Sequence, residues 1–340
     1  MLRKIQHPGF SVPREIPVPY ALPMDLPPPV SFNASDYPAF LETIGLIGMG
    51  GGMFPVSRKV RASHGVHTLV INGVECEPGV TIDQAVLLHH ARWVIAGAEA
   101  SARATGAKRI VLAVKKETAL TGKLRKLYPF DLLTMPRTYP AGAEKLILRK
   151  LLRRMPPPGA LPFHLGFIVQ NTATLRAVGR AVLDGIPAVE RPLTLAAPDV
   201  NFYQNLIAPV GMTFHELLQA AGCSYQPDLQ ILVAGGLMMG RAVSADEKIT
   251  LGTTSLLVLN RRRVETRETG CIRCGACFDA CPLTLHPIAL VDIIRNGQRH
   301  SESFKSQLKE CFLCGACAAV CPAHIPLAVH LREGKQCLQH

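Results

Sequence analysis

Two cysteine runs near the C-terminus constrain the fold of this chain more than any other feature. The runs are CIRCGACFDACP, with Cys271, Cys274, Cys277 and Cys281, and CFLCGACAAVCP, with Cys311, Cys314, Cys317 and Cys321. Each follows the spacing C-x2-C-x2-C-x3-C and ends in a proline, Pro282 or Pro322. Cysteine pairs two residues apart also bind structural zinc, but a zinc site has no use for a repeated third and fourth cysteine followed by proline. The spacing therefore favours iron–sulfur clusters over zinc.

The same run occurs in bacterial two-cluster ferredoxins, where the fourth cysteine of each run ligates the other cluster. Three closely spaced thiolates can cover one face of a [4Fe–4S] cubane, but the loop cannot bend round to supply the fourth. We predict that the first cluster is held by Cys271, Cys274, Cys277 and Cys321. The second cluster is then held by Cys311, Cys314, Cys317 and Cys281. Two such clusters form an electron-transfer module, but they identify neither donor nor acceptor.

The size and charge of the chain place these clusters in a larger basic protein. Its 340 residues and 48% hydrophobic content predict two or three domains. Lys and Arg outnumber Asp and Glu by 37 to 25, which suits an anionic cofactor, an acidic protein partner or an anionic membrane face. No nucleic-acid-binding signature stands out, so nucleic acid is not an expected partner. Without a signal peptide or a long apolar stretch, we expect a soluble or peripheral cytoplasmic protein with no transmembrane segment.

The order of hydrophobic segments predicts four parts. Residues 1–38 form an extended Pro-rich arm, and 39–188 alternate strands and helices as in a Rossmann-like α/β domain with a parallel or mixed sheet. Residues 189–260 form a small α+β domain with strands at RPLTLAA, LQILVAGG and TTSLLVLN, and 261–340 form an α-helical cluster module after a charged linker. In the α/β domain we expect strands at 67–73, 109–115, 131–136 and 164–170, and one helix over 83–106.

A glycine-rich stretch, GLIGMGGGMFPVSRKV at residues 45–60, is a candidate nucleotide-binding loop. It does not fit a Rossmann dinucleotide fingerprint, because Met53 stands at the third glycine position and the stretch follows a helix-like segment. A P-loop is excluded because no Gly-Lys-Ser/Thr follows. The amides of such a loop can still hold one phosphate, with Arg58 and Lys59 supplying positive charge.

Polar residues follow several of the predicted strands. INGVECEPGVTID (71–83) places two glutamates beside Cys76, where a solvated acidic loop is the alternative to a binding site. TYPAGAEK (138–145) and VQNTATL (169–175) follow later strands. Ligands of open α/β sheets bind at the carboxyl ends of the strands. We therefore expect these loops and the glycine loop to surround one ligand.

In this order, the glycine loop, NGVECEP, YPAGAEK, VQNTATL and the cysteine runs resemble the C subunit of the Rnf electron-transport complex. The resemblance covers about residues 40–335 and includes AGGLMMG (234–240), similar to the family's GGPMMG. The chain also resembles two other proteins. The cobalamin reductase of propanediol utilisation is the nearer of these relatives, and the flavin subunit of respiratory complex I is the more distant one. The resemblance implies FMN at the glycine loop, NAD(H) beside it, and a β-grasp domain of the SLBB type at 189–260.

The resemblance also implies which residues form the flavin site. Those facing the FMN phosphate and ribityl chain would be Gly48, Gly50, Gly51 and Lys59. Those near the isoalloxazine and the nicotinamide would be Asn72, Glu75 and Glu77. The pocket would be completed by Tyr139, Gly142, Glu144, Asn171 and Thr172, with Asp83 as a further candidate.

Three features depart from the family pattern. The family's loop reads like GLGGAGFPT, so Met53 replaces a glycine and Val56 replaces a threonine. The lipoyl-type segment that precedes this loop in the family is replaced here by the Pro-rich arm. The chain also ends soon after Cys337, without the long basic tail of some relatives.

The resemblance implies an NADH-linked oxidoreductase subunit in which FMN receives electrons from NADH and passes them singly to the clusters. The flavin carries the chemistry, so no catalytic side chain is required, and Glu75 and Glu77 would position the nicotinamide. Membrane-bound subunits of an Rnf-like complex would be the partners, which predicts a peripheral protein on the inner face of the cell membrane. The departures leave two alternatives: a flavin-less iron–sulfur relay, or a soluble electron donor resembling cobalamin reductase.

Basic residues gather on one predicted helix and on the charged linker. They are Arg149, Lys150, Arg153 and Arg154, and Arg261 to Arg263. They could dock an acidic partner, or they could form an ordinary solvated surface.

Overall fold

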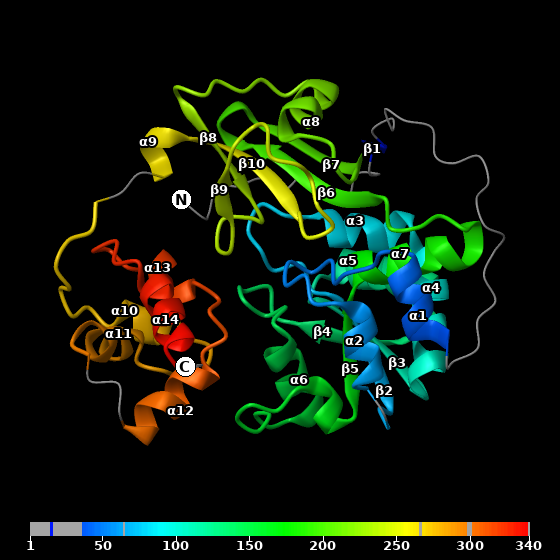
Figure 1. Cartoon of the computed structure of the whole chain (residues 1–340), viewed down its shortest axis with the longest axis horizontal. Coiled ribbons are helices and arrows are strands. Elements are labelled where there is room, and N and C mark those ends of the chain that lie inside the picture. The colour runs from blue at the N-terminus through cyan, green and yellow to red at the C-terminus, as the bar shows by residue number, and fades with distance from the viewer. Residues whose placement is uncertain (1–13, 16–35, 64, 265–266, 298–300, 339–340) are drawn as a thin grey trace. The chain divides into compact units, whose positions relative to one another are not determined.

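The structure, a computed structural model, describes residues 14–15, 36–63, 65–264, 267–297 and 301–338. The chain divides into two compact units, one of Met1–Met155 with Leu161–Asn260 and one of Pro156–Ala160 with Arg261–His340 (Figure 1). The division after Asn260 falls at the expected start of the cysteine-rich part. Most of the predicted Pro-rich arm lies outside the described residues.

The first unit contains a four-stranded parallel sheet in the order β4–β3–β2–β5. Its strands are β2 (Thr68–Gly73), β3 (Arg109–Lys115), β4 (Asp131–Met135) and β5 (Phe167–Asn171). Strands β2 and β3 are apolar and buried over consecutive residues, as expected of strands covered on both faces. The predicted parallel α/β sheet is therefore confirmed.

Helices cover both faces of this sheet. One face packs on α1 (Tyr37–Thr43), α2 (Val56–Arg61), α3 (Ile82–His89), α4 (Ala91–Thr105), α5 (Thr118–Leu127) and α7 (Thr172–Asp184). The other face packs on α6 (Glu144–Leu152), and η3 (Pro162–Leu165) precedes β5. Helices α4 and α7 approach so closely that a Cβ added at Gly97 would lie 1.9 Å from the Leu175 carbonyl oxygen.

The single helix predicted over 83–106 is wrong, because His90 separates α3 from α4. The buried His90 ring turns inward, and its Nδ1 accepts a hydrogen bond from Arg176 Nε at 2.7 Å. Burial and the neighbouring Arg176 charge lower the pKa of His90 to about 3, so the ring stays neutral. The buried hydrogen bond between His90 and Arg176 thus outweighs the continuous helical pattern of the segment.

A mixed six-stranded sheet completes the first unit, in the order β1–β7–β6–β10–β8–β9. Its elements are β1 (Arg14–Glu15), β6 (Glu190–Ala197), η4 (Pro198–Val200), β7 (Phe202–Pro209), α8 (Phe214–Ala221), β8 (Gln230–Ala234), β9 (Arg241–Val243) and β10 (Ser255–Asn260). Strands β6 and β10 pair in parallel, and α8 covers an apolar core that includes Leu193, Phe214 and Leu256. This is a β-grasp arrangement; the SLBB type and the boundary at residue 189 stay predictions.

The second unit consists of helices and connecting loops in its described residues. Its helices are α9 (Arg261–Val264), α10 (Ala276–Asp279), α11 (Pro287–Arg295), α12 (Glu302–Glu310), α13 (Ala316–Ala319) and α14 (Leu327–Gln336). The two cysteine runs fold alike: Arg273 and Leu313, at matching positions, both take a left-handed conformation, with φ of 54° and 57°. The predicted charged linker is partly helical, because α9 lies within it. Among the described residues, no helix is long and apolar enough to span a membrane.

Candidate functional sites

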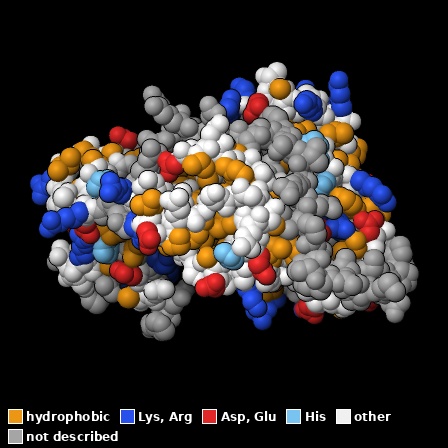
Figure 2. Space-filling model, turned by 90° about the horizontal axis from the view of Figure 1, so that it is seen from above, with side chains coloured by type: hydrophobic (Ala, Val, Ile, Leu, Met, Phe, Trp, Pro, Cys, Tyr) orange, Lys and Arg blue, Asp and Glu red, His pale blue; other side chains and the backbone are white. Residues whose placement is uncertain are grey.

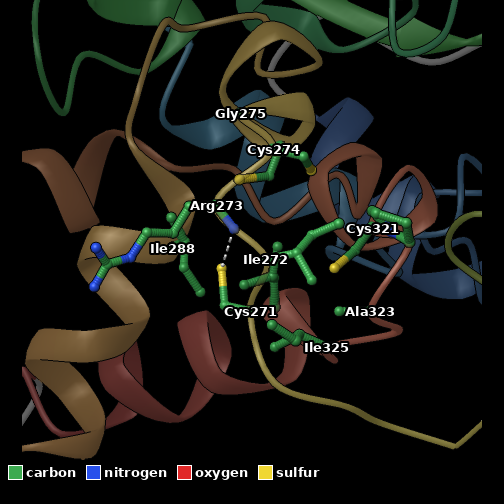
Figure 3. A pocket seen from close by; sticks show the side chains of 12 residues that line it. Cys271, Ile272, Arg273, Cys274, Gly275, Ile288, Cys321, Ala323 and Ile325 are labelled. Atoms are coloured by element: carbon green, nitrogen blue, oxygen red, sulfur yellow. Dashed lines mark hydrogen bonds between the residues drawn. The ribbon is translucent and has the colours of Figure 1, made fainter.

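One cavity in the second unit is lined by four cysteines from both runs. Figure 3 shows Cys271 and Cys274 on the loop before α10 and Cys321 approaching from after α13; Cys277 also lines the cavity. Apolar side chains such as Ile288, Ile325 and Leu327 complete its wall. The structure thus brings together the residues predicted to hold the first cluster.

A second cavity is lined by the complementary set of thiols. Cys311, Cys314 and Cys317 come from the second run and Cys281 from the end of the first. Leu285, Leu290 and Leu331 are among the apolar residues around them. The thiols are therefore placed as the predicted exchange of the fourth cysteine between runs requires, and the ligation itself stays a prediction.

Backbone N–H groups point at the thiols of both cavities. Arg273 N–H donates to Cys271 Sγ, and Leu313 N–H donates to Cys311 Sγ, each with an N···S distance of 3.4 Å. Leu285 N–H donates to Cys281 Sγ at the same distance. Such bonds stabilise negative charge on sulfur and help to set the potential of an iron–sulfur cluster.

The donor chemistry of these cavities fits iron–sulfur clusters. Burial raises the pKa of the Cys317 thiol to about 12, and a coordinated metal would remove that proton outright. In the described part of the chain, no three His, Cys, Asp or Glu residues are arranged to hold a single metal ion. Four thiols spread around an apolar cavity instead match the ligand set of a [4Fe–4S] cubane.

The glycine loop of the first unit presents open backbone. Gly48 N–H donates to the Phe54 carbonyl at 2.9 Å and Met49 N–H donates to Thr174 Oγ1 at 3.0 Å, which closes the base of the loop. Between them, the N–H groups of residues 50–53 donate to no described backbone group. A Cβ added at Gly51, where φ is 91°, would meet nothing within 4 Å. The tip of this loop can therefore receive an anionic ligand.

Met53 does not occupy the space over these glycines. Its backbone is left-handed, with φ of 46°, and its side chain packs on Gly252, where an added Cβ would lie 2.4 Å from the Met53 sulfur. Val56, the other departure from the family pattern, is buried in the core at the start of α2. Both substitutions are thus accommodated by packing away from the loop's open face; the Pro-rich arm toward which Met53 could turn lies outside the described residues.

Three predicted residues form a hydrogen-bonded network beside the loop, in which Glu75 is buried and Asp83 and Asn171 are partly buried. Asp83 N–H donates to Glu75 Oε2 at 2.8 Å, and Asn171 Nδ2 donates to Asp83 Oδ2 at 2.8 Å. Asn171 Cβ also lies 3.3 Å from the position of a Cβ on Gly50. Burial raises the pKa of both carboxyl groups, and the Asp83 charge raises that of Glu75 further. The predicted residues Gly50, Asn171, Asp83 and Glu75 are therefore contiguous.

Arg191, which the sequence reasoning missed, anchors this network. It is 1% exposed on β6; its Nη1 donates to the Met49 carbonyl at 2.7 Å and its Nε to the Thr253 carbonyl at 2.6 Å. Its charge lowers the pKa of Asp83 against the effect of burial. The sequence signal that could have identified Arg191 was a single arginine in the otherwise uncharged stretch RPLTLAA.

The other predicted residues form two groups of contacts, one around Asn72 and one between Lys59 and Glu144. Asn72 Nδ2 donates to the Gly142 carbonyl at 2.9 Å, and Thr172 Oγ1 donates to the Asn72 carbonyl at 3.2 Å. Lys59 and Glu144 form an ion pair at 2.7 Å, which joins α2 to the start of α6. Tyr139 lies in the same β4–α6 connection, half-buried, before a cis peptide bond to Pro140. Polar side chains from the ends of β2, β4 and β5 thus meet at one sheet edge.

Glu77 makes contacts of a different kind. Its Oε1 accepts hydrogen bonds from Met238 N–H at 2.5 Å and Met239 N–H at 3.3 Å, in the AGGLMMG turn. Gly236 is required there, because an added Cβ would lie 2.2 Å from Glu77 Cγ. Glu77 therefore joins the acidic loop to the β-grasp sheet, whereas Glu75 bonds to Asp83.

Glu77 is expected to make stability depend on pH. Burial raises its pKa to about 7, above the unfolded value of 4.5, so the folded chain holds this proton longer than the unfolded chain. Stability should consequently fall as pH rises from 4.5 to 7. Glu77→Gln keeps an oxygen acceptor without the charge, and should be more stable than wild type at pH 8 by about 2–3 kcal/mol. Denaturant unfolding of both proteins at pH 5 and pH 8 measures this difference; equal pH dependence would contradict it.

The basic residues noted in the sequence lie on the surface. Arg149, Lys150, Arg153 and Arg154 are exposed at the end of α6, and Arg261 and Arg262 are exposed on α9. Figure 2 shows Lys and Arg side chains scattered over the face in view, without one continuous patch. The named residues are exposed, which is compatible with a solvated surface and with a docking site; the side chain of Arg263 lies outside the described ones.

Comparison with family models assigns cofactor-binding domains to both units. A model described as the Nuo51 FMN-binding domain matches residues 41–180, and one described as a 4Fe-4S dicluster domain matches residues 269–325. The predicted FMN and [4Fe–4S] cofactors are confirmed at the level of the domain family.

Comparison with curated proteins finds relatives over most of the chain. The C subunit of the ion-translocating oxidoreductase complex of Pasteurella multocida is 33% identical over 87% of this chain and 36% of the relative. The protein of the same name from Rhodobacter capsulatus is 33% identical over 76% of this chain and 52% of the relative. The C subunit of the proton-translocating ferredoxin:NAD(+) oxidoreductase complex of Clostridium ljungdahlii is 32% identical over 74% and 56%. The chain thus spans about a third to a half of the length of these relatives.

Solved structures share the fold. The NAD+-reducing [NiFe]-hydrogenase in the H2-reduced state matches with a TM-score of 0.58 and 20% identity, over 83% of this chain and 52% of that chain. The same hydrogenase in the air-oxidized state matches with a TM-score of 0.59 and 18% identity, over 91% of this chain and 66% of that chain.

Proposed function

The chain belongs to the family of the C subunits of ion-translocating, Rnf-type oxidoreductase complexes, and from this premise we propose that it carries electrons between NAD(H), FMN and two [4Fe–4S] clusters. The observation that carries the proposal is that one chain presents both kinds of site. Two cavities are each lined by four thiols, and a glycine loop with open amides adjoins a polar sheet edge.

The residues of the first unit would bind and orient the flavin. The amides of residues 50–53 would receive its phosphate or ribityl oxygens. Lys59 is paired with Glu144 at 2.7 Å, so it would contribute positive charge by exchanging that partner for the phosphate. Arg191 holds the Met49 carbonyl and so fixes the base of the loop. Glu75, Asn72 and Asn171 lie at the carboxyl ends of neighbouring strands, where they would contact the flavin ring and an incoming nicotinamide. When bound, FMN supplies the exchange between two-electron and one-electron transfer.

The residues of the second unit would hold the clusters. We assign Cys271, Cys274, Cys277 and Cys321 to one cluster, and Cys311, Cys314, Cys317 and Cys281 to the other. Their N–H···S bonds and apolar walls would tune the potentials and limit the access of water. The partners would be membrane-bound subunits of the complex, and the chain would lie peripherally on the cytoplasmic face.

The proposal is tested by NADH-dependent reduction of an artificial acceptor by the anaerobically purified chain. Steady reduction that requires bound flavin supports the assignment. A chain that holds both clusters but no flavin would leave the flavin-less relay as its function. A flavoprotein that NADH cannot reduce would contradict the NAD(H)-linked activity and favour a different donor.

Gly50→Val should weaken FMN binding specifically. A Cβ at this position would lie 3.3 Å from Asn171 Cβ, and the larger side chain would push the loop away from β5. Overpacking of about 1.4 kcal/mol would lower FMN affinity about tenfold. Titration of flavin-depleted protein with FMN, followed by quenching of flavin fluorescence, gives the dissociation constant. Gly122→Val is the control, because a Cβ on Gly122 of α5 meets nothing within 4 Å; equal affinities in the two variants would contradict the placement.

A further inference from the structure

A basic cavity lies beside the second cysteine set and is not explained by the cofactors. It has a volume of about 400 Å³ and lies between the end of α12, the second cysteine loop and α14. Its lining residues are Lys309, Leu313, Arg332, Lys335, Gln336 and Leu338. All three charged residues in this set are cationic, and the neighbouring Glu310 and Glu333 do not line the cavity.

The cavity is physically joined to the loop that would hold the second cluster. Lys335 Nζ donates to the Cys311 carbonyl at 2.5 Å and to the Lys309 carbonyl at 3.2 Å. Leu313, which lines the cavity, also donates its N–H to Cys311 Sγ. A molecule seated in this cavity would therefore contact the backbone that surrounds the Cys311 thiol.

Two of the cations are available to a partner. Lys309 and Arg332 are exposed, and within the described ranges neither forms an ion pair with a carboxylate. Lys305, one turn earlier on α12, is instead paired with Glu302 at 2.7 Å and lies outside the cavity. Lys309 and Arg332 thus present unneutralised positive charge around apolar Leu313 and Leu338.

We propose that this surface, defined by Lys309, Leu313, Arg332, Lys335, Gln336 and Leu338, docks an acidic electron-transfer protein that exchanges electrons with the second cluster. The inference rests on the proposed function and adds the chemistry of the partner and its place on the chain. Carboxylates of the partner would meet Lys309 and Arg332, and its apolar centre would meet Leu313 and Leu338. One electron leaves the reduced partner and enters the cluster, with no bond made or broken. A concave site beside a cluster loop suits a protruding protein surface better than a planar membrane.

The test compares Lys309→Glu/Arg332→Glu with the control Lys305→Glu in the full-length, cluster-loaded chain. The probe is a reduced acidic bacterial ferredoxin, mixed with each protein in a stopped-flow instrument at several ionic strengths. The double variant should lower the second-order rate constant about tenfold at low salt, and the difference should shrink as salt rises. Lys305→Glu should stay within about twofold of wild type, because Lys305 lies outside the cavity.

Two further measurements separate this proposal from the function on which it rests. Iron content, and NADH-dependent reduction of a small uncharged acceptor, should be the same in wild type and both variants. Equal ferredoxin rates and equal salt dependence in the double variant and the control would overturn the docking surface while leaving the proposed function intact. Loss of binding to anionic phospholipid vesicles with an unchanged ferredoxin rate would also overturn it, and would identify a membrane contact. A chain without clusters would overturn both proposals.

Discussion

Cys281→Ala is expected to remove the cluster built on the second cysteine run and to leave the cluster of its own run intact. Cys281 lines the cavity of Cys311, Cys314 and Cys317, although it lies thirty positions before Cys311 in the sequence. A cubane that loses one of four thiolates loses a quarter of its protein ligands. Iron should therefore fall from about eight to about four atoms per chain in anaerobically purified protein. Cys337→Ala is the matched control, because Cys337 lines neither cavity, and its iron content should not change.

Double variants distinguish exchange of the fourth ligand from ligation within each run. With exchange, Cys281→Ala/Cys311→Ala affects a single cluster and should retain about four irons, whereas Cys281→Ala/Cys271→Ala should retain almost none. Ligation within each run requires the opposite result for the two pairs. Iron analysis and low-temperature EPR of the dithionite-reduced proteins measure both outcomes.

Arg191→Ala should destabilise the first unit by about 3–5 kcal/mol, because it removes two charge-assisted hydrogen bonds and leaves the Met49 and Thr253 carbonyls without this buried donor. The guanidinium bonds to the Met49 and Thr253 carbonyls and offsets the burial of Asp83. Its loss also frees the base of the glycine loop, so FMN affinity should fall in parallel. Arg191→Lys restores the charge but not the paired donors, and should recover only part of both effects.

Trp93 provides the readout for this variant. It is the only tryptophan in the chain, and it lies on α4 beneath the guanidinium groups of Arg176 and Arg180, at 5.3 and 5.2 Å. Denaturant unfolding followed by its fluorescence therefore reports on the first unit. Arg109→Ala is the control, because the Arg109–Asp131 pair is mostly exposed and should contribute less than about 1 kcal/mol. Similar losses in the Arg191 and Arg109 variants would show that Arg191 is not the anchor of the loop.

The grouping of the cysteines could be predicted from the sequence because the spacing within each run is local. The spacing of Cys271 to Cys277, and of Cys311 to Cys317, determines which thiols can face one cluster. The parallel sheet was also predictable, since continuous apolar runs at 109–115 and 67–73 are typical of strands buried on both faces. The gathering of Asn72 and Asn171 followed from their positions at strand ends, and the two residues are in register across β2 and β5.

The remaining features depend on contacts between distant segments. Arg191 lies 142 positions after Met49, whose carbonyl it binds, so no local pattern relates the two residues. The break at His90 depends on Arg176 of α7, and the separate role of Glu77 depends on the turn at residues 236–240. Strand β7 was missed because Gln204 and Asn205 interrupt its hydrophobic pattern. The sequence could not show where the Met53 side chain lies, because only the fold reveals Gly252 as its packing partner.

Anaerobic titration with NADH tests the central claim most directly, because it follows both kinds of cofactor on one chain. The purified protein should contain about eight irons and one FMN, and NADH should bleach the flavin absorbance and then the iron–sulfur absorbance. Preparations that contain both clusters but no FMN, or that keep the full absorbance spectrum after NADH is added, would contradict the proposed electron transfer from NAD(H) through FMN to the clusters.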